Sequence, residues 1–128
     1  MSNSTFRDSV CVVTGGASGL GREIGHQLAA AGATVILADI DAVGLAAAGS
    51  GKKTVRTDVT DAGSVKTLVD TVLAAHGRID YFFNNAGIAV AGEIRDLSLD
   101  DWRGVIEVNL MGEINCIHHV YPAMIAQG

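Results

Sequence analysis

The sequence is poor in basic residues and in charge generally. Lysine and arginine number nine among 128 residues, charged residues make up only 18%, and the formal net charge is −5. The nine are scattered, so no basic stripe could neutralise a run of phosphates, and we expect no nucleic-acid partner. Residues 1–9 lack a basic segment followed by an apolar stretch, and no hydrophobic run approaches the ~20 residues of a membrane span. We therefore expect a cytoplasmic protein with no membrane partner.

Residues that bind metals or form disulfides are also scarce. The two cysteines, Cys11 and Cys116, lie in apolar segments without the spacing of a metal site or a redox motif. We expect two buried, reduced thiols rather than a disulfide. No two of the four histidines have a convincing ligand spacing with a carboxylate partner, so we expect no metal site. The histidines are His26, His76, His118 and His119.

Aliphatic residues, in contrast, are abundant. Hydrophobic residues make up 48% of the chain, which fits a parallel sheet covered on both faces, whose strands are continuous aliphatic runs. A chain of this length suits one domain, residues 1–128, with a single core. The apolar content also leaves surface for a partner, and we expect a homo-oligomer.

Strand and helix patterns alternate along the chain. The predicted strands are residues 10–13, 34–38, 53–56 and 79–83. The predicted helices are residues 22–31, 43–48, 62–76 and 100 to about 126. Gly32 and Gly77 end two of these helices, and Pro122 bends the last one or ends its regular part. Short loops and right-handed crossovers then predict a doubly wound parallel α/β sheet of about four strands in the order 3-2-1-4.

A glycine-rich segment, Thr14–Gly21 (TGGASGLG), joins the first strand to the first helix. Gly15 allows a sharp turn, Gly19 lets the backbone approach a phosphate, and Gly21 lets the helix pack closely on the strand. The pyrophosphate of a dinucleotide would meet the helix N-terminus here. A turn that only needs positive φ is the alternative interpretation.

An acidic residue, Asp39, stands at the end of the second predicted strand, 18 residues after Gly21. At that place its side chain can hydrogen-bond the hydroxyl groups of the adenosine ribose. The alternative is a solvated turn aspartate, such as the nearby Asp41. Arg22 lies inside the helix and no basic residue follows Asp39 before Lys52, so the sequence favours NAD over NADP.

Four motifs in this order resemble the N-terminal half of the short-chain dehydrogenases/reductases. They are TGGASGLG, Asp58-Val59 after the third strand, Asn84–Gly87 (NNAG), and Asn109 within VNLMG. Any one could occur by chance, but four together are highly specific, and the resemblance covers nearly the whole chain. It implies a Rossmann fold, NAD as cofactor, and hydride transfer between the nicotinamide and an alcohol or ketone substrate.

The resemblance also implies roles for single residues. Asp58 and Val59 would contact the adenine ring through the carboxylate and a backbone group, unless they are a turn and a core residue. Asn84–Gly87 would stabilise the sheet and line the ribose and nicotinamide side. Asn109 would hold a water of the proton relay by distorting its helix, unless it is an ordinary helix amide. The cofactor-binding residues would be Gly15, Ser18, Gly19, Leu20, Gly21, Asp39, Asp58, Val59, Asn85, Ala86 and Gly87.

The family's catalytic serine and Tyr-x-x-x-Lys helix are absent from the sequence. Neither Tyr81 nor Tyr121 is followed four positions later by lysine, and the sequence ends at Gly128. We expect an NAD-dependent oxidoreductase of which this chain is a fragment, inactive alone. The alternative is a catalytically silent nucleotide-binding or interaction module.

Overall fold

Four parallel strands form the sheet at the centre of the molecule. The computed structural model describes residues 4–128, and its strands are β1 (Val10–Thr14), β2 (Thr34–Asp39), β3 (Lys53–Arg56) and β4 (Tyr81–Phe83). They are hydrogen-bonded in the order β3-β2-β1-β4. In the middle of β1, Val12 lies between Ile36 of β2 and Phe82 of β4. The predicted doubly wound sheet and its strand order are confirmed.

Helices connect the strands close to the predicted positions. They are α1 (Gly19–Ala30), α2 (Ala42–Ala48), α3 (Ala62–His76), α4 (Leu99–Ile106) and α5 (Gly112–Gln127). Short 3-10 turns at Ser4–Phe6 and Ile94–Asp96 precede β1 and α4. Gly32 and Gly77 follow α1 and α3 with φ values of 89° and 74°, the left-handed conformation in which glycine commonly ends a helix.

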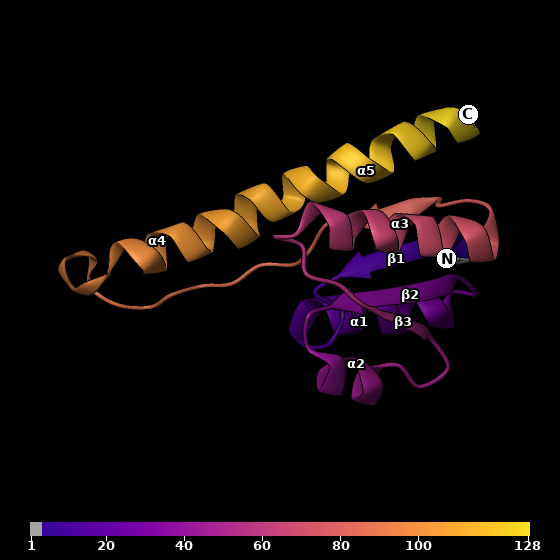
Figure 1. Cartoon of the computed structure of the whole chain (residues 1–128). Coiled ribbons are helices and arrows are strands. Elements are labelled where there is room, and N and C mark those ends of the chain that lie inside the picture. Colours follow the sequence, from indigo (N-terminus) through magenta and orange to yellow (C-terminus); the bar gives the residue numbers. More distant parts are fainter. Residues whose placement is uncertain (1–3) are drawn as a thin grey trace.

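Different helices cover the two faces of the sheet (Figure 1). Alternate residues of a strand point to opposite faces, and all five residues of β1 are buried. Cys11 and Val13 pack with residues of α1 and α2 on one face. Val10 and Val12 pack with residues of α3 and with Val120 of α5 on the other. The central strand is therefore enclosed by apolar side chains on both sides, as the aliphatic composition predicted.

Two predicted boundaries are wrong. β4 begins at Tyr81 and not at Ile79. The backbone N–H of Ile79 donates to Oε1 of Gln127, and its carbonyl accepts from Nε2 of the same side chain, both at 2.9 Å. Because Gln127 takes both backbone groups, Ile79 stands outside the strand. In addition, α1 begins earlier than predicted, at Gly19, so the last glycines of the glycine-rich segment form the first helical turn.

The end of the chain forms one long helical rod (Figure 1). It consists of α4, a π-helical segment at Glu107–Met111, and α5. The rod passes through Pro122 and ends at Gln127, so Pro122 does not end the regular helix, and the other predicted alternative, a bend at this residue, stays a prediction. Proline cannot donate to the carbonyl one turn earlier, but that carbonyl belongs to His118, which is exposed and can reach water. α4 projects beyond the sheet, and none of its residues is buried.

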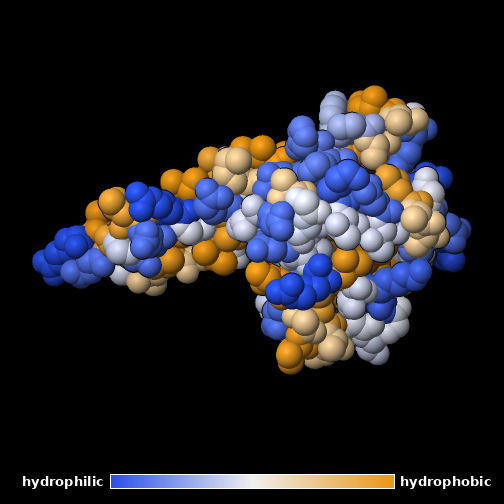
Figure 2. Space-filling model, in the orientation of Figure 1, coloured by the Kyte–Doolittle hydropathy of each residue, from blue (hydrophilic) through white to orange (hydrophobic). Residues whose placement is uncertain are grey.

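Large apolar side chains line the outer side of this rod and are called the helix stripe below. Its members are 45–69% exposed, and they are Leu99, Trp102, Ile106, Leu110, Ile114, Ile117, Tyr121 and Ile125. They recur every third or fourth residue and therefore share a face, whereas Cys116 and Val120 of α5 are buried against the body of the molecule. Figure 2 shows hydrophobic residues recurring along the rod. No helix within residues 4–128 has both the length and the hydropathy that a membrane crossing requires.

Candidate functional site

A pocket of ≈ 140 Å³ lies where the strands end. Its lining residues are Gly15, Asp39, Ile40, Thr57, Asp58, Val59, Ala86, Gly87, Ile88 and Val108. They follow or end all four strands, apart from one residue of the π-helical segment. Ligands of doubly wound sheets bind at this carboxyl edge. Six of the eleven predicted cofactor-binding residues line the pocket. Ile40, Thr57, Ile88 and Val108 were not predicted.

The glycine-rich segment brings backbone close to backbone beside this pocket. Gly15 has a φ of 66°, and a Cβ there would lie 3.0 Å from both the Cα of Ala86 and Nδ2 of Asn85. A Cβ on Gly21 would overlap the carbonyl oxygen of Gly15. Only glycine satisfies both positions without moving the chain. The sequence predicted Gly15 to allow a sharp turn and Gly21 to allow close packing of the helix on the strand, and these contacts agree with both expectations.

The N-terminus of α1 presents its backbone to open space. Its N-cap residue, Ser18, makes no side-chain cap hydrogen bond. Gly19 has a φ of 51°, and a Cβ there would meet nothing within 4 Å. Leu20 is 68% exposed. An uncapped helix N-terminus with open space before it has unsatisfied N–H groups and a positive dipole end, which together suit an anion such as a phosphate.

The carboxylate of Asp39 is held in place by two backbone N–H groups. Ala17 in the glycine-rich segment donates to Oδ2 at 3.1 Å, and Asp41 donates to Oδ1 at 3.0 Å. Asp41 itself caps α2, where its carboxylate accepts from the N–H groups of Val43 and Gly44. The two aspartates therefore differ: Asp41 is the turn residue, and Asp39 faces the pocket.

Thr14, the last residue of β1, ties the loop after β4 to the glycine-rich segment. Its hydroxyl oxygen accepts from the N–H groups of Asn85 and Ala86, each at 3.0 Å. Nδ2 of Asn85 donates to the carbonyl of Thr14 at 3.1 Å. The Asn85 side chain thus stabilises the sheet edge and does not line the pocket. Sequence reasoning did not single out Thr14, which is fully buried.

Asn109 lies within the π-helical segment, as a locally distorted helix requires. Its Oδ1 accepts from the N–H of Ile88 and its Nδ2 donates to the carbonyl of Ile88, both at 2.8 Å. The side chain is therefore committed to the loop beside Gly87. The relay water assigned to Asn109 stays a prediction.

These features match a family model described as short chain dehydrogenase over residues 9–128. The chain belongs to the short-chain dehydrogenase family. Among curated relatives, it is 40% identical over 130 residues to cis-4-hydroxycyclohexanecarboxylate dehydrogenase of Sinomonas cyclohexanicum, covering 96% of this chain and 52% of the relative. It is 34% identical over 125 residues to meso-2,3-butanediol dehydrogenase of Serratia marcescens, covering 94% of this chain and 50% of the relative. The chain spans about half the length of these relatives.

Solved structures of short-chain dehydrogenases have the same fold. A short-chain dehydrogenase/reductase of Burkholderia phymatum in complex with NAD superposes with a TM-score of 0.90 at 36% identity, covering 95% of this chain and 46% of the other. An NAD⁺-bound xylitol dehydrogenase gives a TM-score of 0.90 at 32% identity, covering 95% of this chain and 50% of the other. At these identities the likeness extends beyond the fold to family membership.

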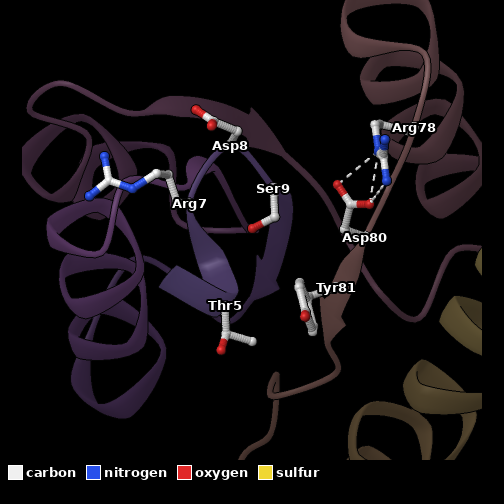
Figure 3. Close-up of a pocket in the computed structure, with 7 residues that line it drawn as sticks. All are labelled: Thr5, Arg7, Asp8, Ser9, Arg78, Asp80 and Tyr81. Atoms are coloured by element: carbon white, nitrogen blue, oxygen red, sulfur yellow. Dashed lines mark hydrogen bonds and ion pairs between the residues drawn. The ribbon is translucent and has the colours of Figure 1, made fainter. Parts of the chain in front are cut away.

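A larger pocket, ≈ 430 Å³, lies at the opposite, amino end of β1 and β4, and no predicted site residue lines it. Figure 3 shows Arg78 paired with Asp80, while Arg7 points away from both. Partial burial pushes the pKa of Asp80 upward, but bonds from Arg78 and from the N–H of Val10 outweigh it, so this pKa lies below its ordinary value. Arg78 and Asp80 thus form an ion pair with each other.

Both cysteines of the chain are buried free thiols, as predicted. Burial raises the pKa of Cys11. Burial, together with the nearby charge of Glu113, raises the pKa of Cys116 to about 12. Since the thiolate is the reactive form, both thiols are inert near neutral pH. Within residues 4–128, no three His, Cys, Asp or Glu side chains are grouped so as to hold a metal ion.

Replacing Thr14 tests how the site is held together. Thr14→Val keeps the shape but leaves the N–H groups of Asn85 and Ala86 without an acceptor, so we expect a loss of about 2 to 4 kcal/mol in unfolding free energy. Thr14→Ser keeps the hydroxyl and should lose only about 1 kcal/mol for the missing methyl group. Urea unfolding of the ligand-free protein measures both. Equal stability of the two variants would contradict the proposed hydrogen bonds.

Proposed function

We propose that this chain binds NAD(H) at the carboxyl edge of its sheet, as the cofactor-binding part of an oxidoreductase. The reaction is hydride transfer between the nicotinamide and an alcohol or carbonyl carbon of a small substrate. The observation that carries the proposal is that the turn of Gly15, the carboxylate of Asp39 and the Asp58-Val59 pair line one pocket. NAD-bound members of the family with the same fold support it.

The residues fit the parts of a dinucleotide in order. The uncapped N-terminus of α1, from Ser18 to Gly21, would receive the pyrophosphate. Asp39 would accept hydrogen bonds from the adenosine ribose, and Asp58 with Val59 would contact the adenine. Ala86 and Gly87 would border the nicotinamide side. Bound there, the cofactor supplies the site that accepts or donates the hydride.

Proton transfer needs groups that this sequence does not contain. Hydride transfer to a carbonyl builds negative charge on oxygen, which a nearby acid must neutralise. In the family this acid is the tyrosine of the Tyr-x-x-x-Lys pair. We propose that Asn109 contributes to the proton relay from the π-helical segment, and that residues 1–128 contribute binding rather than the complete chemistry.

We further propose that the protein forms homo-oligomers through the helix stripe. The side chains of the stripe are exposed and recur along α4, the π-helical segment and α5. A straight row of apolar side chains is complementary to a second copy of itself related by a two-fold axis. Within residues 4–128, β4 lies at the edge of the sheet beside β1, and a strand edge is a second place where copies could associate. The free thiols fit a reducing compartment, so we also propose a cytoplasmic location.

The proposed position of Asp39, facing the ribose 2′ position, leads to a prediction about the choice between NADH and NADPH. A 2′-phosphate there would meet like charge worth about 4 kcal/mol per pair before screening, so NADH should bind at least about tenfold more tightly than NADPH. Asp39→Asn should lower the ratio of the NADH affinity to the NADPH affinity. Asp41→Asn, which removes a neighbouring negative charge but keeps the oxygen that caps α2, should leave the ratio of the two affinities unchanged. Calorimetric titration measures the affinities for NADH and NADPH. Equal affinities in the unmodified protein would contradict the proposal that Asp39 binds the ribose.

Activity of the 128-residue chain is the second prediction. Without the tyrosine, general acid catalysis worth about 10²- to 10⁴-fold is lost, and we expect no detectable turnover. A panel of alcohols and ketones with NAD(H), followed at the nicotinamide absorbance, measures this. Turnover by this chain would show that its own residues supply the proton.

Self-association is the third prediction. We expect the unmodified protein to form dimers or larger species in light scattering, because burial of the helix stripe removes apolar surface from water. The double variant Ile114→Lys and Ile117→Lys should shift it toward the monomer. Val43→Lys, at an exposed apolar residue of α2 away from the stripe, is the matched control. A well-behaved monomer at high concentration of the unmodified protein would refute the proposal.

A further inference from the structure

The adenine side of the pocket is formed by a short irregular segment, Thr57–Thr60. The N–H of Thr57 donates to the carbonyl of Asp39 at 2.8 Å, and the N–H of Asp58 donates to Oγ of Ser64 at 2.9 Å. Oδ1 of Asp58 accepts from the N–H and the hydroxyl of Thr60, at 2.9 and 2.7 Å. These bonds fix Asp58 locally but do not hold the following residue, Val59.

Val59 is held by residues of helix α5. Nδ2 of Asn115 donates to the Val59 carbonyl at 2.8 Å. One turn earlier in the helix, a Cβ on the buried Gly112 would lie 2.7 Å from Cγ2 of Val59. The absence of a side chain at Gly112 therefore lets the helix approach closely enough for the Asn115 bond. Val59 packs in the same place against the fully buried Val65 and Cys116.

We propose that Asn115, aided by Gly112, is a positioning residue for adenine recognition. The hydrogen bond from Asn115 fixes the Val59 carbonyl and therefore the orientation of the backbone around Val59. This backbone in turn sets the positions of Val59 and of the Asp58 carboxylate at the pocket. Neither Asn115 nor Gly112 lines the pocket, so both act through Val59. The inference rests on the proposed NAD-binding function, and it adds to that function a residue 56 positions from the group it holds.

The same helix provides a matched control at its other end. Gln127 also uses its side-chain amide to grip a backbone segment, at Ile79. Ile79 lies before β4, on the opposite edge of the sheet from the pocket. If both amide side chains only stabilise the fold, replacing either one should lower stability without changing adenine recognition. A positioning residue should affect adenine recognition only at Asn115.

The test compares NAD with its hypoxanthine analogue, in which a 6-oxo group replaces the 6-amino group of adenine. A carboxylate accepts a hydrogen bond from the amino group and is repelled by the oxo group, so the unmodified protein should prefer NAD. Asn115→Leu removes the donor at nearly constant volume, and Gly112→Ala pushes Val59 away. In each variant we expect NAD affinity to fall by about threefold to tenfold and the preference for NAD to narrow toward one.

Calorimetric titration, at a temperature where circular dichroism shows every variant folded, measures the affinities. Gln127→Leu should lower the midpoint of thermal unfolding and keep the preference for NAD. Folded Asn115→Leu or Gly112→Ala protein that keeps the full preference would overturn the positioning role. An unmodified protein that binds both dinucleotides equally would overturn the inference and leave NAD binding standing. One that binds neither would overturn the proposed function, and this inference with it.

Discussion

Backbone packs directly on backbone where β1, α1 and the loop after β4 meet, and the candidate site depends on this contact. A side chain on Gly21 would overlap Gly15, and one on Gly15 would press on Ala86. The Thr14 hydroxyl binds the same loop from the end of β1. Because the NNAG loop, in which Asn85 lies 71 positions after Thr14, shares one small volume with the turn and the helix N-terminus, these three parts hold fixed positions relative to one another. The pocket is the space left beside them.

One side of the long helical rod holds the segments that connect the strands, and the other side carries exposed apolar residues. Its inner side grips the sheet connections through amide side chains: Asn109 holds Ile88, Asn115 holds Val59, and Gln127 holds Ile79. A side-chain amide can donate and accept at once, so it can replace the missing neighbour of an irregular backbone segment. The outer side carries the apolar helix stripe.

Much of the fold could be predicted from the sequence, because local patterns specify it. Aliphatic runs predicted the four strands and their order, and Gly32 and Gly77 correctly marked helix ends. Asp39, at the end of β2, was predicted to face a ligand, and it lines the pocket. The error at the start of β4 has a non-local physical origin. Ile79 has a strand-like side chain, but its backbone is taken by Gln127, 48 residues away.

The parts of the site that were missed follow the same rule. Thr14, Asn115 and Gly112 act through contacts with residues far along the chain, and no periodicity or spacing reveals such contacts. Pro122 shows the reverse case: a local signal for a bend or an end of the helix does not end it, and His118, whose carbonyl the proline leaves without its usual donor, is an exposed residue. Local signals therefore located the glycine-rich turn and the acidic residues, whereas their supports became visible only in three dimensions.

The central claim is that NAD binds at the carboxyl edge of the sheet, beside the glycine-rich turn. The most direct measurement is a nuclear magnetic resonance titration of the ¹⁵N-labelled 128-residue chain with NAD, following each backbone amide. The account predicts the largest shifts at Gly15, Gly19, Asp39, Asp58 and Gly87, which surround the pocket and the start of α1. Shifts confined to the opposite pocket, around Ser9 and Arg78, or no saturable shifts at all, would contradict it.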